Sequence, residues 1–212
     1  IPEGMSYSHA AFAETCAGVI ACHKTNRVAL GDTVVIIGDG PVGCLHLDIA
    51  RASGAGKVIL LARGKIKLAE QFQPDYLISN YDPEAATKKV LELTGGRGAD
   101  MVILADPNVQ AQGQALQIVR KRGKIIIYGG VPKSNEMSSL NSNLIHYNEI
   151  TLTGSFSYPA TGLSEALLAL KTGWVDADRY INAIVSLNDV TTGMDMMKSG
   201  RALKVLIDPW KE

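Results

Sequence analysis

The sequence predicts an α/β protein built on a doubly wound parallel sheet, and three observations support this fold class. Between about Asp32 and Gly130, short runs of Val, Ile and Leu alternate with segments of helical pattern. The runs are apolar throughout, as expected for parallel strands that helices cover on both faces. A glycine-rich turn at residues 38–43 follows the first run and opens the first helix.

Five segments of this region have the length and composition of buried strands. They are TVVIIG (33–38), KVILLA (57–62), YLIS (76–79), MVILA (101–105) and GKIIIYGG (123–130). Helices are predicted between them. They are VGCLHLDIARAS (42–53), KIKLAEQF (65–72), a helix that starts after Asp82, and QGQALQIVRK (112–121). Strands that alternate with helices in this way favour a parallel sheet between two helical layers.

The helix after Asp82 carries its own boundary signals. Asp82 is the predicted N-cap, Pro83 takes the first helical position, and Gly95–Gly96 ends the helix. Beyond Gly130 the alternation of strands and helices stops, and a different series of elements is predicted. They are a polar loop (132–143), a strand (150–157), two helices (163–173 and 187–200) and a final strand (202–208).

Composition excludes several classes of protein. Lys plus Arg and Asp plus Glu both number 21, so the chain lacks the basic surplus of a nucleic-acid binder. No apolar run reaches about 18 residues, so no membrane span is expected. Cys16, Cys22 and Cys44 form no CxxC pair and are odd in number. Reduced thiols in a cytoplasmic protein are the simplest interpretation.

The glycine turn predicts a dinucleotide site of the Rossmann type. Gly38, Gly40 and Gly43 form G-x-G-x-x-G between a strand and a helix. The first glycine permits a tight turn, the second lets the backbone approach a pyrophosphate, and the third allows close packing of helix on strand. The helix N-terminus then favours the anion. Pro41 and Val42, inside the motif, are included among the predicted cofactor-binding residues.

The end of the second strand bears on the choice of coenzyme. Enzymes that prefer NAD place an acidic residue about 20 positions after the first glycine, where it binds the ribose hydroxyls. This chain has Ala62 and Arg63 there. A guanidinium can bind a 2′-phosphate bidentately, which favours NADP over NAD. The alternative is that Arg63 is a solvated loop residue.

The chain resembles the medium-chain dehydrogenase/reductase superfamily, in its zinc-dependent alcohol and polyol (sorbitol-like) dehydrogenase branch. The ordered segments that carry the resemblance are IPEGMSYSHAAFAETCAGVIACHKTNRVALGDTVVIIGDGPVG, GGRGADMVILA, RKRGKIIIYGGVPK, NLIHYNEITLTGSFSY and MKSGRALKVLI. The resemblance covers essentially the whole chain. It implies the C-terminal, coenzyme-binding part of such an enzyme, without the GroES-like domain that carries most zinc-binding segments. The implied division is a catalytic-domain remnant (1–15), a Rossmann domain (16–157) and returning C-terminal elements (158–212).

The resemblance also implies roles for individual residues. Glu14 falls at the position of a third protein ligand near the catalytic zinc, although the branch has Glu–Pro where this chain has Glu14–Thr15. Cys16 competes with Glu14 if the local register shifts, and a helix-surface role is the alternative for Glu14. The expected coenzyme contacts are Ala105, Gly129, Gly130, Val131, Ser155, Ser157 and Lys204. Lys204 would reach the pyrophosphate, or would be a solvated charge. The loop after Arg63 is shorter than the family's usual connection.

The resulting expectation is hydride transfer between a secondary alcohol or polyol and NADP (or NAD), with zinc in the complete enzyme. No residue of this chain is assigned as catalytic, and the chain alone is expected to be inactive. A homodimer or homotetramer is expected to form through the strand at 150–157, which should be a sheet edge. The alternatives are a non-catalytic NAD(P)-binding redox sensor or oligomerisation unit, and a zinc-independent quinone reductase. His9, His23, His46 and His146 lack metal-ligand spacing and are expected to be packed or surface histidines.

Overall fold

The computed structural model describes residues 1–211 and contains a six-stranded, fully parallel sheet. The strand order is β3-β2-β1-β4-β5-β6. The strands are β1 (Thr33–Ile37), β2 (Lys57–Ala62), β3 (Tyr76–Ser79), β4 (Ala99–Leu104), β5 (Val119–Ile127) and β6 (Thr151–Gly154). The doubly wound α/β prediction is confirmed. The strand order reverses between β1 and β4, and in such sheets ligands bind outside the carboxyl ends of the strands at that point.

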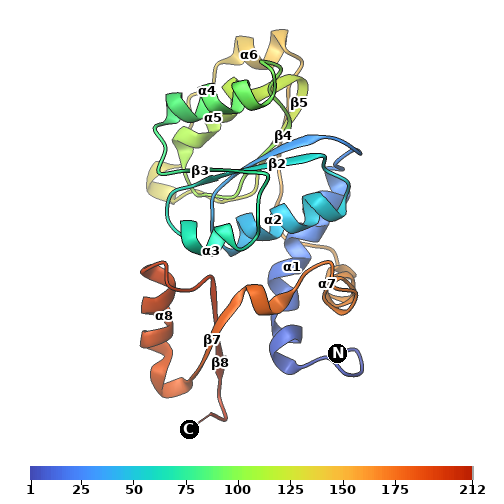
Figure 1. Ribbon diagram of the computed structural model, residues 1–212, viewed down its shortest axis with the longest axis vertical. Helices are drawn as coiled ribbons and strands as arrows, with labels where there is room; N and C mark the ends of the chain where they lie inside the picture. Colours follow the sequence, from blue (N-terminus) through green and yellow to red (C-terminus); the bar gives the residue numbers. More distant parts are fainter. Residues whose placement is uncertain (212) are drawn as a thin grey trace.

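Helices cover both faces of the sheet (Figure 1). The helices of the two layers are α1 (Tyr7–Thr25), α2 (Pro41–Ala52), α3 (Ile66–Glu70), α4 (Pro83–Leu93), α5 (Val109–Ile118) and α6 (Ser142–Tyr147), and α7 (Gly162–Lys171) packs against α1. Alternate residues of β1 supply the two cores. Val34 and Ile36 pack with α1 and α2, whereas Val35 and Ile37 pack with α4 and α5. Both faces of β1 are therefore dry, which explains its uninterrupted apolar sequence.

The structure corrects the predicted end of one helix and the predicted end of one strand; non-local pairing explains the first, and a change of chain direction at Ser157 explains the second. The helix predicted over 112–121 is α5, and the chain becomes β5 already at Val119, which pairs with Ala99. The strand predicted over 150–157 ends at Gly154. Ser155 still donates its N–H to the Ile127 carbonyl at 3.0 Å, but Ser157 has φ of +65°, so the chain turns away from the sheet. As predicted, β6 forms the edge of the sheet.

The C-terminal elements form a smaller unit below the sheet in Figure 1, near both chain ends. They are η2 (Ala177–Arg179), β7 (Ile181–Ser186), η3 (Leu187–Asp189), α8 (Val190–Lys198) and β8 (Lys204–Asp208). A separate 3-10 turn, η1 (Lys133–Asn135), lies between β5 and α6 and is not part of this unit. β7 and β8 pair in parallel as a separate two-stranded sheet. β7 was not predicted, and α8 begins at Val190 instead of residue 187 because a 3-10 turn precedes it.

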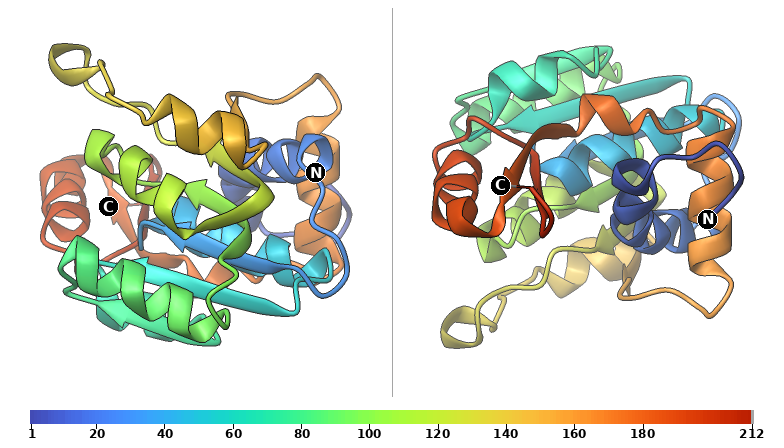
Figure 2. Two further views of the ribbon diagram at one scale, coloured as in Figure 1. Left: turned by 90° about the horizontal axis from the view of Figure 1, so that it is seen from above. Right: turned by 90° about the horizontal axis from the view of Figure 1, so that it is seen from below.

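Helix α1 places the N-terminal residues against the rest of the fold. It runs without a break from Tyr7 to Thr25, so the boundary expected at residue 15 falls inside one helix. Figure 2 shows α1 beside α7, and the Lys24 ammonium contacts the Glu165 carboxylate at 2.6 Å between the two helices. No helix in the described part of the chain is long and apolar enough to span a bilayer. The three cysteines are buried and unpaired, as the composition predicted.

A buried pair of histidines joins α1 to α2. His23 Nε2 and His46 Nδ1 lie 3.0 Å apart, and the other ring nitrogen of each histidine has no partner among residues 1–211. The His46 ring also meets the Tyr128 ring edge-on, with centroids 4.5 Å apart. Burial lowers the pKa of His23 to about 4, and burial together with His23 lowers the pKa of His46 well below its usual value. These two histidines are packed, as predicted.

The histidine pair should make the fold labile to mild acid. Since both histidines bind protons more tightly in the unfolded chain, the free energy of unfolding should fall as the pH drops below about 6.5. Between pH 7.5 and 5.5 we expect a loss of about 1.3 kcal/mol for each histidine, measured by urea titration. A His23→Gln variant should show a smaller loss than wild type. The control is His146→Gln, at an exposed site. An equal loss in wild type and His23→Gln would contradict the account.

Candidate functional site

The three glycines of the turn carry three different steric roles. Gly38 has φ of +120°, and a Cβ there would lie 3.0 Å from the Ala105 carbonyl carbon. A Cβ on Gly43 would lie 1.9 Å from the Gly38 carbonyl oxygen, which no side chain can tolerate. Around Gly40, by contrast, nothing lies within 4 Å of the Cβ position. The turn is therefore closed by Gly38 and Gly43 and open at Gly40.

The open side of the turn is the N-terminus of α2. Gly40 is the N-cap, no side chain caps it, and Pro41 takes the first turn. The backbone N–H groups and the positive end of the helix dipole are thus left for an anion. Gly38, Gly40, Pro41, Val42 and Gly43 are brought together as the glycine motif predicts. Ala105 lies against Gly38 at the carboxyl end of β4.

On the β2 side of the turn, Ala62 is the last residue of β2 and Arg63 follows it directly. The Arg63 guanidinium sits over the Tyr81 ring, 4.2 Å from its centroid. Asp39, inside the glycine motif, accepts hydrogen bonds from the backbone N–H groups of Gly64, at 2.9 Å, and Lys65. This carboxylate fixes the short loop that holds Arg63.

Two of these residues were not singled out from the sequence. An acidic residue inside a glycine-rich turn is conspicuous, so Asp39 could have been noticed in the sequence, but its role depends on the loop at Gly64 and Lys65 folding back onto its carboxylate. No sequence pattern pointed to Tyr81, because its contact with Arg63 depends on the ends of β2 and β3 lying side by side. Burial raises the pKa of the nearby Asp106 carboxyl, Asp39 adds to the rise, and Arg63 opposes it.

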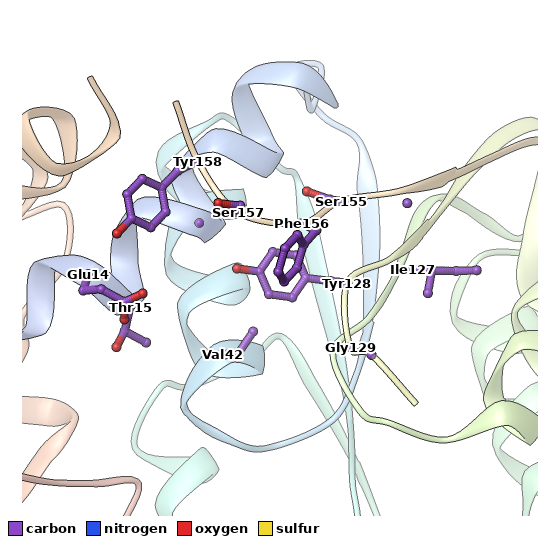
Figure 3. A pocket seen from close by; sticks show the side chains of 13 residues that line it. Glu14, Thr15, Val42, Ile127, Tyr128, Gly129, Ser155, Phe156, Ser157 and Tyr158 are labelled. Carbon is purple, nitrogen blue, oxygen red and sulfur yellow. The ribbon is translucent and has the colours of Figure 1, made fainter. Parts of the chain in front are cut away.

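A cavity of about 700 Å³ lies at the carboxyl ends of β5 and β6 (Figure 3). Its walls come from α1, from the first turn of α2, and from the segments that follow the two strands. The lining residues are Glu14, Thr15, Gly18, Val42, Ile127, Tyr128, Gly129, Gly130, Gly154, Ser155, Phe156, Ser157 and Tyr158. Six predicted site residues meet here, namely Glu14, Val42, Gly129, Gly130, Ser155 and Ser157.

Other predicted residues lie outside this cavity wall. Val131 follows Gly130 and does not line it. Lys204, at the start of β8, donates a hydrogen bond from its ammonium to the Thr15 hydroxyl at 3.1 Å. Since Thr15 lines the cavity, Lys204 lies one residue behind the wall. Tyr128, Phe156 and Gly18 line the cavity although the sequence did not single them out.

The described residues do not form a metal centre by themselves. No group of three or more His, Cys, Asp or Glu side chains that could hold a metal ion occurs within residues 1–211. Glu14 is exposed at the cavity and belongs to no such group among the described residues. Cys16, its alternative, is fully buried in the core, and burial raises the pKa of its thiol to about 12. A protonated, inward-facing thiol is unsuited to a metal that binds the thiolate.

The fold is a Rossmann-like α/β domain of the kind found in medium-chain dehydrogenases. A sequence profile of the zinc-binding dehydrogenase family matches residues 41–172, and the chain belongs to that family. A sorbitol dehydrogenase of Bombyx mori is 30% identical over 213 residues, which cover 98% of this chain and 60% of the relative. A D-arabitol-phosphate dehydrogenase of Enterococcus avium is 30% identical over 212 residues, covering 98% of this chain and 59% of the relative.

Solved structures show the same fold. A 2R,3R-butanediol dehydrogenase from Bacillus subtilis superposes with a TM-score of 0.88 at 22% identity, over 99% of this chain and 60% of that one. A structure named for a zinc-binding dehydrogenase from Sinorhizobium meliloti 1021, and bound to NADP, superposes with a TM-score of 0.84 at 27% identity. That match covers 99% of this chain and 61% of the other. The chain thus spans about 60% of the length of the relatives that it matches.

Proposed function

We propose that this chain is the coenzyme-binding part of an NAD(P)-dependent alcohol or polyol dehydrogenase of the zinc type. One observation carries the proposal. The N-terminus of α2 is open to an anion at Gly40, and Val42 in the same helical turn also lines the cavity at the carboxyl ends of β5 and β6. Relatives named for sorbitol, arabitol phosphate and butanediol support a polyol or small alcohol as substrate. The bound nicotinamide would supply the hydride chemistry.

The helix N-terminus, Arg63 and the cavity would each bind a different part of the coenzyme. The pyrophosphate would bind the N-terminus of α2, where the backbone at Gly40 is accessible. The adenosine half would extend over β1 and β2 toward Arg63, whose guanidinium would take a 2′-phosphate. The nicotinamide half would extend over β4 and β5 into the cavity. The NADP bound to the Sinorhizobium meliloti protein is consistent with this choice of coenzyme.

Zinc does not fit the described residues alone. Glu14 offers one carboxylate at the cavity, and a catalytic zinc in proteins takes three protein ligands. We propose that zinc belongs to the complete enzyme, with Glu14 as one ligand and the others supplied from outside this chain. What this chain contributes to the reaction is then the binding and orientation of the coenzyme.

Coenzyme binding can be tested at Gly40. Its φ of −76° and ψ of 179° suit any residue, and the Cβ position is open, so Gly40→Val should fold normally. The valine side chain would occupy the place proposed for the pyrophosphate. Calorimetric titration with NADPH should show binding to wild type and none to Gly40→Val. Unchanged affinity in a correctly folded variant would exclude the proposed site.

The preference for NADP can be tested at Arg63. A charge-assisted contact with the 2′-phosphate is worth about 1.5–3 kcal/mol, so NADPH should bind about ten- to a hundred-fold more tightly than NADH. Arg63→Ala should remove this preference. Lys67→Ala, which removes an exposed charge nearby, is the matched control and should preserve it. Equal affinities for the two coenzymes in wild type would refute the assignment of Arg63.

We also propose that two copies associate through the edge strand β6. An edge strand presents backbone groups that a symmetry-related copy can pair with. Sedimentation at micromolar concentration should show a dimer, and Leu152→Lys on β6 should shift it toward monomer. Thr87→Lys, on α4, is the control and should leave the dimer intact. A monomeric wild type would contradict the proposal.

A further inference from the structure

Tyr128 is the first residue after β5, and its side chain lines the cavity (Figure 3). Its backbone N–H still bonds to the Leu104 carbonyl at 3.1 Å, which holds the residue at the carboxyl end of the sheet. The ring packs edge-on against His46 of α2, with centroids 4.5 Å apart. Backbone and ring are therefore both fixed, and the hydroxyl has a defined position at the cavity.

Helix α1 leaves room for that hydroxyl. A Cβ built on Gly18, in the middle of α1, would lie 2.6 Å from the Tyr128 oxygen, well inside contact distance. A glycine inside a helix costs about 1 kcal/mol relative to alanine. Gly18 is nevertheless a buried position of α1. The Tyr128 hydroxyl occupies the space that a side chain at this position would fill.

The hydroxyl is a hydrogen-bond donor over the whole neutral range. Burial raises the pKa of Tyr128 to about 12, and the Cys22 thiol and the Glu14 carboxylate add to the rise. No hydrogen bond from another described residue contributes to this shift. A fixed, protonated phenol at the wall of a cavity has its donor available for an acceptor on the ligand.

The position of the cavity indicates which part of the ligand meets this donor. Val42 belongs both to the first turn of α2, which would hold the pyrophosphate, and to the cavity wall. A dinucleotide held there places one ring over the β1–β3 half and the other over the β4–β6 half. The cavity lies at the ends of β5 and β6, so the nicotinamide ring of a bound coenzyme would enter it. The oxygen of its carboxamide is the acceptor on that ring.

We propose that the Tyr128 hydroxyl donates a hydrogen bond to the carboxamide oxygen of the bound nicotinamide, and that Gly18 is glycine to leave space for this hydroxyl. The proposal rests on the proposed function, because it requires the coenzyme to bind. Tyr128 thereby orients the nicotinamide ring in the cavity, and a side chain rather than the backbone supplies the donor.

The test compares two ligands that differ only by the nicotinamide ring. Calorimetry with NADP⁺ and with 2′-phospho-ADP-ribose separates the cavity from the glycine turn. Tyr128→Phe should weaken NADP⁺ binding about three- to ten-fold, the range expected for one hydrogen bond, and leave 2′-phospho-ADP-ribose unchanged. Gly18→Ala should give the same pattern, because its methyl group displaces the hydroxyl. Tyr147→Phe, which removes the hydroxyl of an exposed tyrosine at the end of α6 and outside the cavity wall, should change the affinity for neither ligand.

A sulfur-substituted coenzyme identifies the acceptor atom. Thio-NADP⁺ carries a thioamide, whose sulfur is a weak acceptor, so wild type and Tyr128→Phe should bind it with equal affinity. Unchanged NADP⁺ affinity in Tyr128→Phe, or equal losses for NADP⁺ and 2′-phospho-ADP-ribose, would overturn the inference. Wild type that binds neither ligand would refute the proposed function itself, which is a separate outcome.

Discussion

The candidate site depends on how closely the start of α2 approaches the end of β1. Gly43 meets the Gly38 carbonyl so tightly that a Cβ would lie 1.9 Å from the oxygen. This contact positions the N-terminus of α2 at the carboxyl end of the sheet and leaves its first turn open at Gly40. Because an anion at a helix N-terminus must reach the backbone itself, the whole coenzyme assignment follows from this one packing constraint.

Side chains on each side of that turn then organise the two halves of the site. On the β2 side, the Asp39 carboxylate binds the backbone of Gly64 and thereby holds the loop of Arg63. On the β5 side, Tyr128 lies between His46 and Gly18 at the cavity. The contacts of Asp39 and those of Tyr128 both join segments that are distant in the sequence. The buried His23–His46 pair fixes α1 to α2 and therefore also supports the cavity wall that α1 forms.

The features predicted correctly from the sequence are those set by local chemistry. The glycine spacing predicted the turn, and Asp82 caps its helix by accepting from the N–H groups of Glu84 and Ala85. The start of β5 was missed because Val119 continues a helical pattern, and only its pairing with Ala99 makes it extended. The roles of Tyr128 and Gly18 depend on α1 crossing the end of β5, which no local pattern encodes. Of the residues that the family resemblance implied, Glu14, Gly129, Gly130, Ser155 and Ser157 line the cavity, whereas Ala105, Val131 and Lys204 do not.

The most direct test of the central claim is an amide NMR titration of the isotopically labelled chain, first with 2′-phospho-ADP-ribose and then with NADP⁺. The account predicts that the first ligand shifts the amide signals of Gly40, Val42 and Gly43, at the start of α2. NADP⁺ should shift these and also the signals of Gly129 and Gly130. Shifts confined to a different surface, such as the pocket lined by Pro83 of α4 and Val109 of α5, or no shifts with either ligand, would contradict the account.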